Sequence, residues 1–160
     1  MKKQGFTLIE VMIVVAIISI ISGFAVINYF SYLPDRKLVN SSGYIYSALN
    51  RAKSEAVKRG EDVAVEFDFT TDQYEIKTQS DNLSIAKGKA DKGVNIFDKN
   101  GNNNATVTFD CRGLKPGVND AIYLCWGDED NAENYNRVRI TTAGSLCIQT
   151  SDHYNSGCWE

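Results

Sequence analysis

The N-terminal part of the chain is one long apolar block. The run from Phe6 to Ile27 covers 22 positions, and no charged residue occurs from Val11 through Pro34. At about 1.5 Å per residue, a helix of this length spans the hydrocarbon core of a bilayer. The block therefore predicts a helix whose first half, residues 6–33, is transmembrane.

Two lysines at the start of the chain predict which way this helix crosses the membrane. Lys2 and Lys3 precede the apolar block, and positively charged residues tend to stay on the cytoplasmic side. We therefore expect a cytoplasmic N-terminus, a single pass through the inner membrane, and a head after Ile27 that lies in the periplasm or outside the cell.

A cleaved secretory signal is the alternative interpretation of the same block. A short basic region, an apolar run and Gly23-Phe24-Ala25 are compatible with one. A signal peptide needs no acidic residue in its apolar core, whereas this core contains Glu10. A carboxylate at membrane depth costs about 2.5 to 3.5 kcal/mol, so Glu10 favours a helix that stays on the mature protein.

Beyond the apolar block the helix is predicted to continue to about Arg59. Pro34 removes one hydrogen bond within the helix and favours a kink, and Gly60 is the expected C-cap. Apolar residues recur at steps of three, four and seven and form one stripe along the helix: Leu38, Ile45, Leu49, Ala52 and Ala56.

After Gly60 apolar and polar residues alternate, which is the period of β-strands. Val63 to Phe69 and Tyr74 to Lys77 predict a hairpin that turns at 70–72, and further strands are expected at 94–97, 105–110, 121–126, 136–141 and 145–150. Short strands separated by turns indicate an antiparallel sheet. The predicted fold class is therefore α+β: a long kinked N-terminal helix, transmembrane in its first half, packed on a small antiparallel β-sheet head.

All four cysteines lie in the C-terminal third of the chain: Cys111, Cys125, Cys147 and Cys158. The sequence has no C-x-x-C pair and one histidine, so a zinc site is not expected. In a head outside the cytoplasm, four cysteines predict two disulfides, each stabilising by about 2 to 4 kcal/mol. Three connectivities are compatible with the sequence, and we favour Cys111 with Cys125 and Cys147 with Cys158.

The residues around Glu10 resemble a known processing site. Gly5-Phe6-Thr7-Leu8-Ile9-Glu10, followed by an uncharged apolar helix, is similar to the prepilin peptidase site of type IV pilins and type II secretion pseudopilins. The resemblance implies that prepilin peptidase cuts between Gly5 and Phe6, that residues 1–5 are a leader, and that the new Phe6 amine is N-methylated. Loss of Lys2 and Lys3 with the leader changes the net charge from −3 to −5.

Gly5 and Glu10 suit these roles chemically. The missing side chain of Gly5 lets the backbone approach a protease at the membrane surface. Cleavage creates a positive amine at Phe6, and Glu10 of one subunit is predicted to pair with the Phe6 amine of a neighbour, which neutralises two charges that are unfavourable in an apolar environment. The alternative for Glu10 is a carboxylate near the membrane boundary that extends to water.

Three further segments resemble the GspH/FimT family: Ala48–Arg59, Phe109–Gly113 and Arg137–Ile148. The resemblance implies a pilin-like fold, with the leader at 1–5, the transmembrane and assembly half of the helix at 6–33 and a periplasmic head at 34–160. It implies a FimU-like minor type IV pilin that joins other major and minor pilins in the initiation or tip complex of an extracellular pilus, for motility, adhesion or DNA uptake. A GspH-like minor pseudopilin of type II secretion is the alternative, and a major pilin is the third.

No enzymatic activity is predicted, and neither a cofactor nor a metal is expected. His153 has no nucleophile motif nearby. Asp128-Glu129-Asp130-Asn131 has oxygen ligands for calcium, but it lacks the spacing of an EF-hand and is interpreted as an acidic turn. Arg137 and Arg139 fall on one strand face, and some FimT relatives bind DNA through arginines of the head. A DNA-binding pilin for natural transformation is therefore a further alternative, but the acidic balance of the chain makes DNA an unfavoured partner here.

Overall fold

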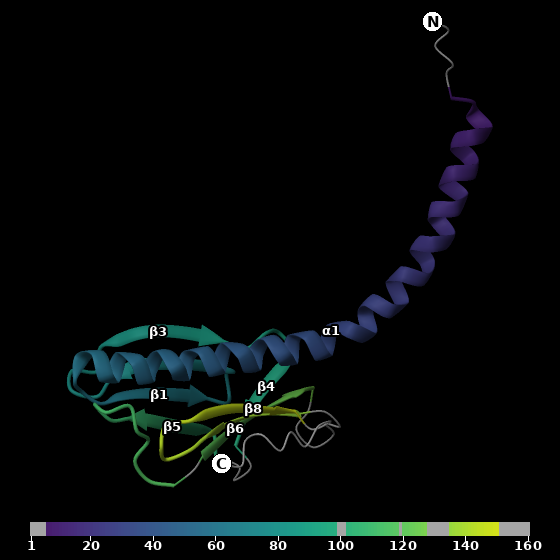
Figure 1. Ribbon diagram of the computed structural model, residues 1–160. Coiled ribbons are helices and arrows are strands. Elements are labelled where there is room, and N and C mark those ends of the chain that lie inside the picture. Colours follow the sequence, from purple (N-terminus) through teal and green to yellow (C-terminus); the bar gives the residue numbers. More distant parts are fainter. Residues whose placement is uncertain (1–5, 99–101, 119, 128–134, 151–160) are drawn as a thin grey trace, which may run out of the picture. The chain divides into compact units, whose positions relative to one another are not determined.

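The computed structural model describes residues 6–98, 102–118, 120–127 and 135–150 (Figure 1). The chain divides into two compact units, Met1–Pro34 and Asp35–Glu160. Helix α1 spans Leu8–Arg59, so it begins in the first unit and ends in the second. The helix end predicted at Arg59 is confirmed, and Pro34 lies inside the helix. The expected kink at Pro34 stays a prediction.

In the first unit, α1 presents large apolar side chains all around its axis. Every large apolar residue from Leu8 to Ile21 is exposed. The hydroxyls of Ser19 and Ser22 donate to backbone carbonyls one turn earlier, at 2.8 and 2.7 Å, so the helix satisfies these polar groups itself. An exposed apolar surface of this extent is unfavourable in water.

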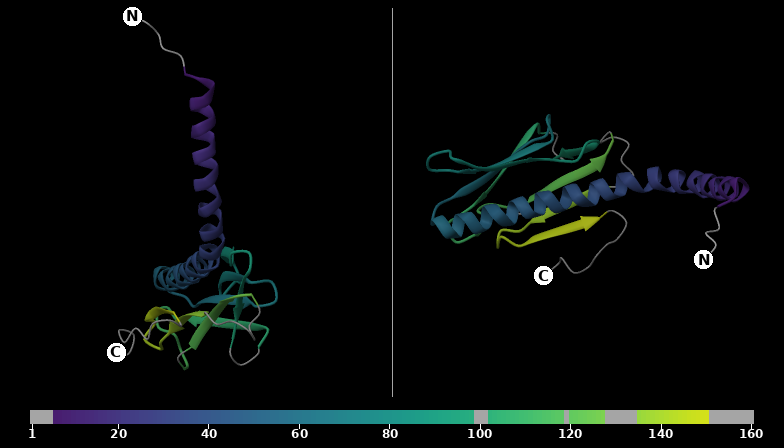
Figure 2. Two further views of the ribbon diagram at one scale, coloured as in Figure 1. Left: turned by 90° about the vertical axis from the view of Figure 1, so that its right-hand side faces the viewer. Right: turned by 90° about the horizontal axis from the view of Figure 1, so that it is seen from above.

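The second unit contains two four-stranded antiparallel sheets (Figures 1 and 2). One sheet has the strand order β3-β2-β1-β5 and the other has the order β4-β6-β7-β8. The strands are β1 Val63–Asp68, β2 Gln73–Thr78, β3 Ser84–Lys89, β4 Val94–Phe97, β5 Asn104–Phe109, β6 Asp120–Trp126, β7 Tyr135–Ile140 and β8 Leu146–Thr150.

Most of these strands agree with the sequence-based prediction. The predicted hairpin is confirmed by β1 and β2, which pair antiparallel from Val63 opposite Thr78 to Asp68 opposite Gln73. The strands predicted later in the chain correspond to β4, β5, β6, β7 and β8. Strand β3 was not predicted, because Ser84–Lys89 has few apolar residues, contains a glycine and lies at the edge of its sheet.

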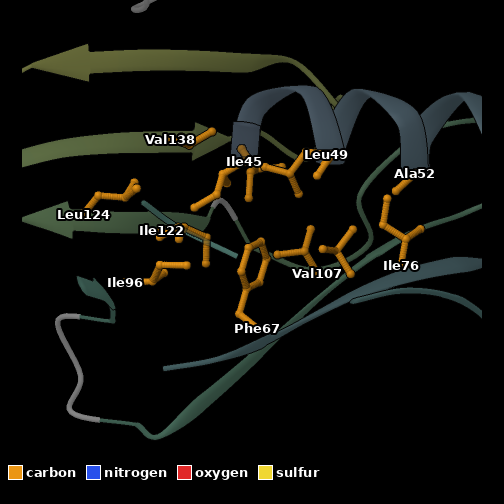
Figure 3. Packing of buried hydrophobic residues seen from close by; sticks show 14 of the residues in the cluster. Ile45, Leu49, Ala52, Phe67, Ile76, Ile96, Val107, Ile122, Leu124 and Val138 are labelled. Atoms are coloured by element: carbon orange, nitrogen blue, oxygen red, sulfur yellow. The ribbon is translucent and has the colours of Figure 1, made fainter. Parts of the chain in front are cut away.

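The apolar stripe of α1 lies at the centre of the core. Leu49, Ala52 and Ala56 are fully buried and belong to one cluster with inward side chains of both sheets, including Phe67 of β1 and Leu124 of β6 (Figure 3). Burial of apolar surface stabilises by about 25 cal/mol per Å², so this shared cluster joins the helix to both sheets. The predicted packing of the N-terminal helix on an antiparallel head is confirmed.

Two buried serines of α1 add polar links to this apolar core. The side-chain amide of Asn136, in β7, donates to the hydroxyl of Ser42 at 3.1 Å. The backbone N–H of Asp91 donates to the hydroxyl of Ser41 at 3.0 Å. Such directional bonds fix the position of the helix along the sheets more specifically than apolar contact does.

Gly60 ends α1 as the sequence predicts. Its φ of 69° lies in the left-handed region that favours glycine, and its N–H donates to the carbonyl of Ala56 at 2.9 Å. Lys58 and Arg59 occupy the last turn, where positive charge is favourable for the helix dipole. The chain can therefore reverse from the helix directly into β1.

The substitution Leu49→Ala is expected to lower the free energy of unfolding of the head by about 2 to 5 kcal/mol, because it leaves a cavity in the shared cluster. Val39→Ala is the matched control, since Val39 lies on the same helix but is 52% exposed. Urea unfolding of the full chain in detergent, followed by circular dichroism, measures the free energy of unfolding of both variants. Equal small losses would show that the stripe does not hold the head together.

Candidate functional site

The helix begins at the residues that carry the predicted processing site. Thr7 directly precedes α1, and the N–H of Glu10 donates to the carbonyl of Thr7 at 3.1 Å and to its hydroxyl at 3.4 Å. Thr7 is therefore the N-cap of the helix, and Glu10 is its third residue. The spacing Thr7-x-x-Glu10 matches a capping box, a signal that the sequence interpretation did not use.

Glu10 is the only charged residue of α1 before Asp35. It lies in the first turn of the helix, where the helix dipole favours a negative charge. Phe6, just before the helix, is 80% exposed. A lone carboxylate among apolar side chains can accept a hydrogen bond from an ammonium group, and such a pair is strong where water is excluded. Gly5 lies outside the described residues.

The three segments that resemble the GspH/FimT family meet near the C-terminal end of α1. Lys53 of α1 donates through Nζ to the carbonyl of Gly144, between β7 and β8, at 2.8 Å. A Cβ on Gly113, between β5 and β6, would lie 3.0 Å from a methyl group of Val57 and 3.2 Å from the Lys53 side chain. We call these four residues the loop junction, because they join both loops to the helix.

The side chain of Asp110 stabilises the loop between β5 and β6 by hydrogen bonds. Its Oδ1 accepts hydrogen bonds from the N–H groups of Arg112 and Leu114, each at 2.9 Å. Its Oδ2 accepts a hydrogen bond from the Arg112 guanidinium at 2.7 Å, and this bond is the main cause of an Asp110 pKa below the ordinary value. The segment Phe109–Gly113 thus has a structural role as a tightly bonded loop.

Arg137 and Arg139 lie on the same face of β7, as predicted, and both are half-buried. The guanidinium of Arg137 donates to the side-chain carbonyl of Gln149 in β8. Arg139 also has an interaction partner. Both arginines are therefore engaged within the chain.

The predicted bond between Cys111 and Cys125 is wrong. Cys111 is exposed in the loop after β5, Cys125 is buried in β6, and the two are not bonded to each other. Gly113 lies next to Gly144, near the start of β6, whereas Cys125 lies near its end. The intervening strand of about 3.3 Å per residue keeps the two sulfur atoms apart.

Cys147, in β8, is disulfide-bonded. Its predicted partner Cys158 lies outside the described residues, as do His153 and the acidic turn 128–131, so the pairing of Cys147 with Cys158 stays a prediction. Within the described ranges, no group of three or more His, Cys, Asp or Glu residues is placed to hold a metal ion. In the same part of the chain, no helical segment combines the length and the apolar character that crossing a membrane requires.

The helix packed on an antiparallel head and the motif at the helix start together define a pilin-like protein. Residues 1–26 match the prokaryotic N-terminal methylation motif, which implies processing by prepilin peptidase. Residues 44–144 match the family described as type II transport protein GspH. The chain belongs to this family of minor pilins and pseudopilins.

Solved structures of two family members have the same fold. The type IV minor pilin FimU of Pseudomonas aeruginosa has a TM-score of 0.61 at 16% identity, over 74% of this chain and 92% of that one. The minor pseudopilin EpsH of the type 2 secretion system of Vibrio cholerae has a TM-score of 0.57 at 13% identity, over 73% of this chain and 99% of that one. These likenesses confirm the predicted pilin-like fold.

Curated relatives match the chain over part of their length. Two fimbrial proteins of Pseudomonas aeruginosa are 35% identical to it over 91 residues, or 56% of this chain. The chain spans 58% of the length of these relatives. The match supports a relation to fimbrial proteins without assigning a position in a filament.

Gly144→Ala is expected to destabilise the head more than Gly117→Ala does. Both glycines have positive φ, 71° and 95°, so alanine is strained at both by about 1 to 2 kcal/mol. At Gly144 the new Cβ would also lie 2.2 Å from the carbonyl oxygen of Gly113, whereas nothing lies within 4 Å at Gly117. Urea unfolding measures the difference, and equal losses would show that the loop junction tolerates a side chain.

Proposed function

We propose that this chain is a minor type IV pilin. Prepilin peptidase removes residues 1–5, the Phe6 amine is methylated, and the subunit is held in the inner membrane before it enters the initiation or tip complex of a pilus. The observation that carries the proposal is Glu10, the single charge between Leu8 and Pro34 in a helix whose large apolar side chains are exposed up to Ile21. The role is structural and includes no catalytic step.

Charge pairing accounts for the position of Glu10. Among apolar helices an unpaired carboxylate costs about 2.5 to 3.5 kcal/mol. Cleavage at Gly5 supplies an ammonium group on Phe6 of a neighbouring subunit, and methylation keeps its positive charge. The charges are satisfied only when the Phe6 amine of one helix lies beside Glu10 of the next, so the pair sets the register of assembly.

The membrane stage of the proposal is supported by the sequence and by the helix itself. Phe6 to Ile27 is long enough to span a bilayer core, and Lys2 and Lys3 favour a cytoplasmic start with a periplasmic head. The hydroxyls of Ser19 and Ser22 are hydrogen-bonded within the helix. Such internal satisfaction of polar groups is what an apolar environment requires.

A minor pseudopilin of type II secretion is the second candidate function. It is favoured by the GspH family match and by the likeness to EpsH, whereas the relation to fimbrial proteins favours the pilus. Deletion of the gene separates the two functions. Loss of twitching motility and surface pili with normal enzyme secretion supports the pilin, and the opposite result supports the pseudopilin.

The substitution Glu10→Leu is expected to leave membrane retention normal and to reduce incorporation into filaments strongly, because the charge pair cannot form. Immunoblots of membrane and sheared-filament fractions measure the ratio of filament-incorporated to membrane-retained protein. Thr7→Ala is the control, since it removes the helix cap but keeps the carboxylate, and it should enter filaments normally. Unchanged incorporation of the Glu10→Leu variant would contradict the charge pairing.

The substitution Gly5→Leu is expected to leave the leader attached, because a bulky side chain keeps the backbone away from the peptidase. Intact mass spectrometry of membrane-extracted protein should then show residues 1–5 retained and Phe6 unmethylated. Gln4→Leu places the same bulk one residue earlier and should be processed. A wild-type protein that retains residues 1–5 would contradict the processing step.

A further inference from the structure

The turn between β3 and β4, residues 90–93, is fastened to α1 near the start of the second unit. The hydroxyl of Ser41 accepts a hydrogen bond from the N–H of Asp91 at 3.0 Å. One helical turn earlier, Nζ of Lys37 donates to the carbonyl of Lys92 at 3.2 Å. Such directional bonds hold the turn at one place beside the helix.

Trp126, at the end of β6, packs on the same turn. A Cβ on Gly93 would lie 2.8 Å from its indole ring, so the ring lies directly on the backbone of the turn. Nζ of Lys37 lies 5.1 Å from the centre of the indole, within the range of a cation–π contact. The tryptophan is nevertheless 37% exposed, so an indole and an ammonium group are both available at the surface here.

A cavity of about 440 Å³ lies at this turn. Its lining consists of Asp72, Lys89, Ala90, Asp91, Lys92 and Gly93. Asp72 has a φ of 54°, in the left-handed region, and its Oδ1 accepts a hydrogen bond from the N–H of Ile96 at 3.0 Å. The cavity therefore combines two ammonium groups with two carboxylates, and the carboxylate of Asp72 is held in position by a backbone donor.

The two lysines of the cavity differ from the other lysines of the head. Ion pairs, carbonyl oxygens or an aromatic ring engage the ammonium groups of Lys37, Lys53, Lys58, Lys77, Lys87 and Lys115. Lys89 and Lys92 are exposed, and within the part of the head that the structure describes neither ammonium group has a partner. Two unengaged cations beside two carboxylates suit a ligand that carries both signs of charge.

The distance along the chain places the cavity at the depth of lipid headgroups when residues 6–33 span the membrane. The uncharged part of α1 ends at Pro34, and Lys37 follows three residues later, which is at most about 4.5 Å of helix. The headgroup region is about 5 to 8 Å thick on each side of the hydrocarbon core. Tryptophan is enriched at this depth, and lysine side chains reach it readily.

We propose that this cavity binds the phosphoethanolamine headgroup of a bilayer phospholipid and so holds the head at the membrane before assembly. The proposal rests on the membrane stage of the proposed function. The ammonium groups of Lys89 and Lys92 bind the phosphate. The carboxylates of Asp72 and Asp91 accept hydrogen bonds from the ethanolamine ammonium group, and Trp126 lies beside the headgroup with its indole at the membrane interface.

The two carboxylates determine which headgroup fits. An ethanolamine ammonium group has N–H donors, whereas a choline group carries methyl groups and donates no such bond. A headgroup that has a phosphate but no cation would leave Asp72 and Asp91 facing a further negative charge. The cavity is therefore expected to prefer ethanolamine to choline headgroups.

Amine labelling of the full chain in vesicles tests this contact. One set of vesicles contains phosphatidylcholine alone, and the other contains equal parts of phosphatidylcholine and phosphatidylethanolamine. Lys58 is the internal reference, because its side chain is 76% exposed and it lies in the last turn of α1. Relative to Lys58, Lys89 and Lys92 should be labelled several-fold more slowly in the vesicles that contain ethanolamine headgroups, as read by peptide mass spectrometry.

The variant Asp72→Asn separates headgroup binding from folding. Asparagine tolerates the left-handed conformation and can still accept the hydrogen bond from Ile96, whereas the negative charge is lost. The difference in labelling between the two kinds of vesicle should then disappear. Asp62→Asn is the matched control at an exposed acid outside the cavity, and it should keep the difference.

Four results would overturn the proposal. Equal relative labelling of Lys89 and Lys92 in both kinds of vesicle, in protein that a carbonate wash does not remove, would exclude the headgroup contact and leave the membrane stage intact. Removal of the protein by that wash would contradict the membrane stage as well. The same protection by inorganic phosphate in detergent would identify a free anion as the ligand, and protection that increases with protein density would identify a second copy of the chain.

Discussion

The structure of the head depends on the burial of one apolar stripe of α1 by two sheets at once. The side chains of Leu49, Ala52 and Ala56 are apolar and buried at this contact. Inward residues of both sheets complete the same cluster. Each sheet has one apolar face that would otherwise be exposed to water. The helix therefore serves as the shared partner of both sheets, and the directional bonds at Ser41 and Ser42 fix where along the sheets it lies.

The same helix has a different surface in its first unit. From Leu8 to Ile21 it is apolar all around, and the described residues of that unit offer no sheet to cover it. The hydroxyls of Ser19 and Ser22 are hydrogen-bonded within the helix, and Glu10 introduces one carboxylate at its start. An apolar helix with a single terminal acid is stable in an apolar environment only if the acid finds a partner. This requirement connects the anchoring and assembly steps in the proposed function.

The sequence predicted those features that depend on local pattern. The alternation in Val63–Asp68 and the stripe that includes Leu49 identified a strand and a buried helix face, because burial on one side imposes a period. Strand β3 escaped prediction because an edge strand needs few apolar residues. The wrong pairing of Cys111 with Cys125 has another cause. Disulfides depend on which strand ends lie together, and spacing along the chain does not contain that information.

The loop junction explains how this chain keeps the fold of its family although its sequence motifs are weak. At 16% identity to FimU the chain retains the same architecture, so most side chains of the core can be exchanged if their apolar period remains. Positions where backbone approaches backbone cannot be exchanged as freely. Gly144 has a positive φ and lies against the carbonyl of Gly113, and Lys53 donates to the Gly144 carbonyl. The segments around these residues close both loops onto the end of α1, and these contacts fix the ends of the two sheets relative to the helix that they share.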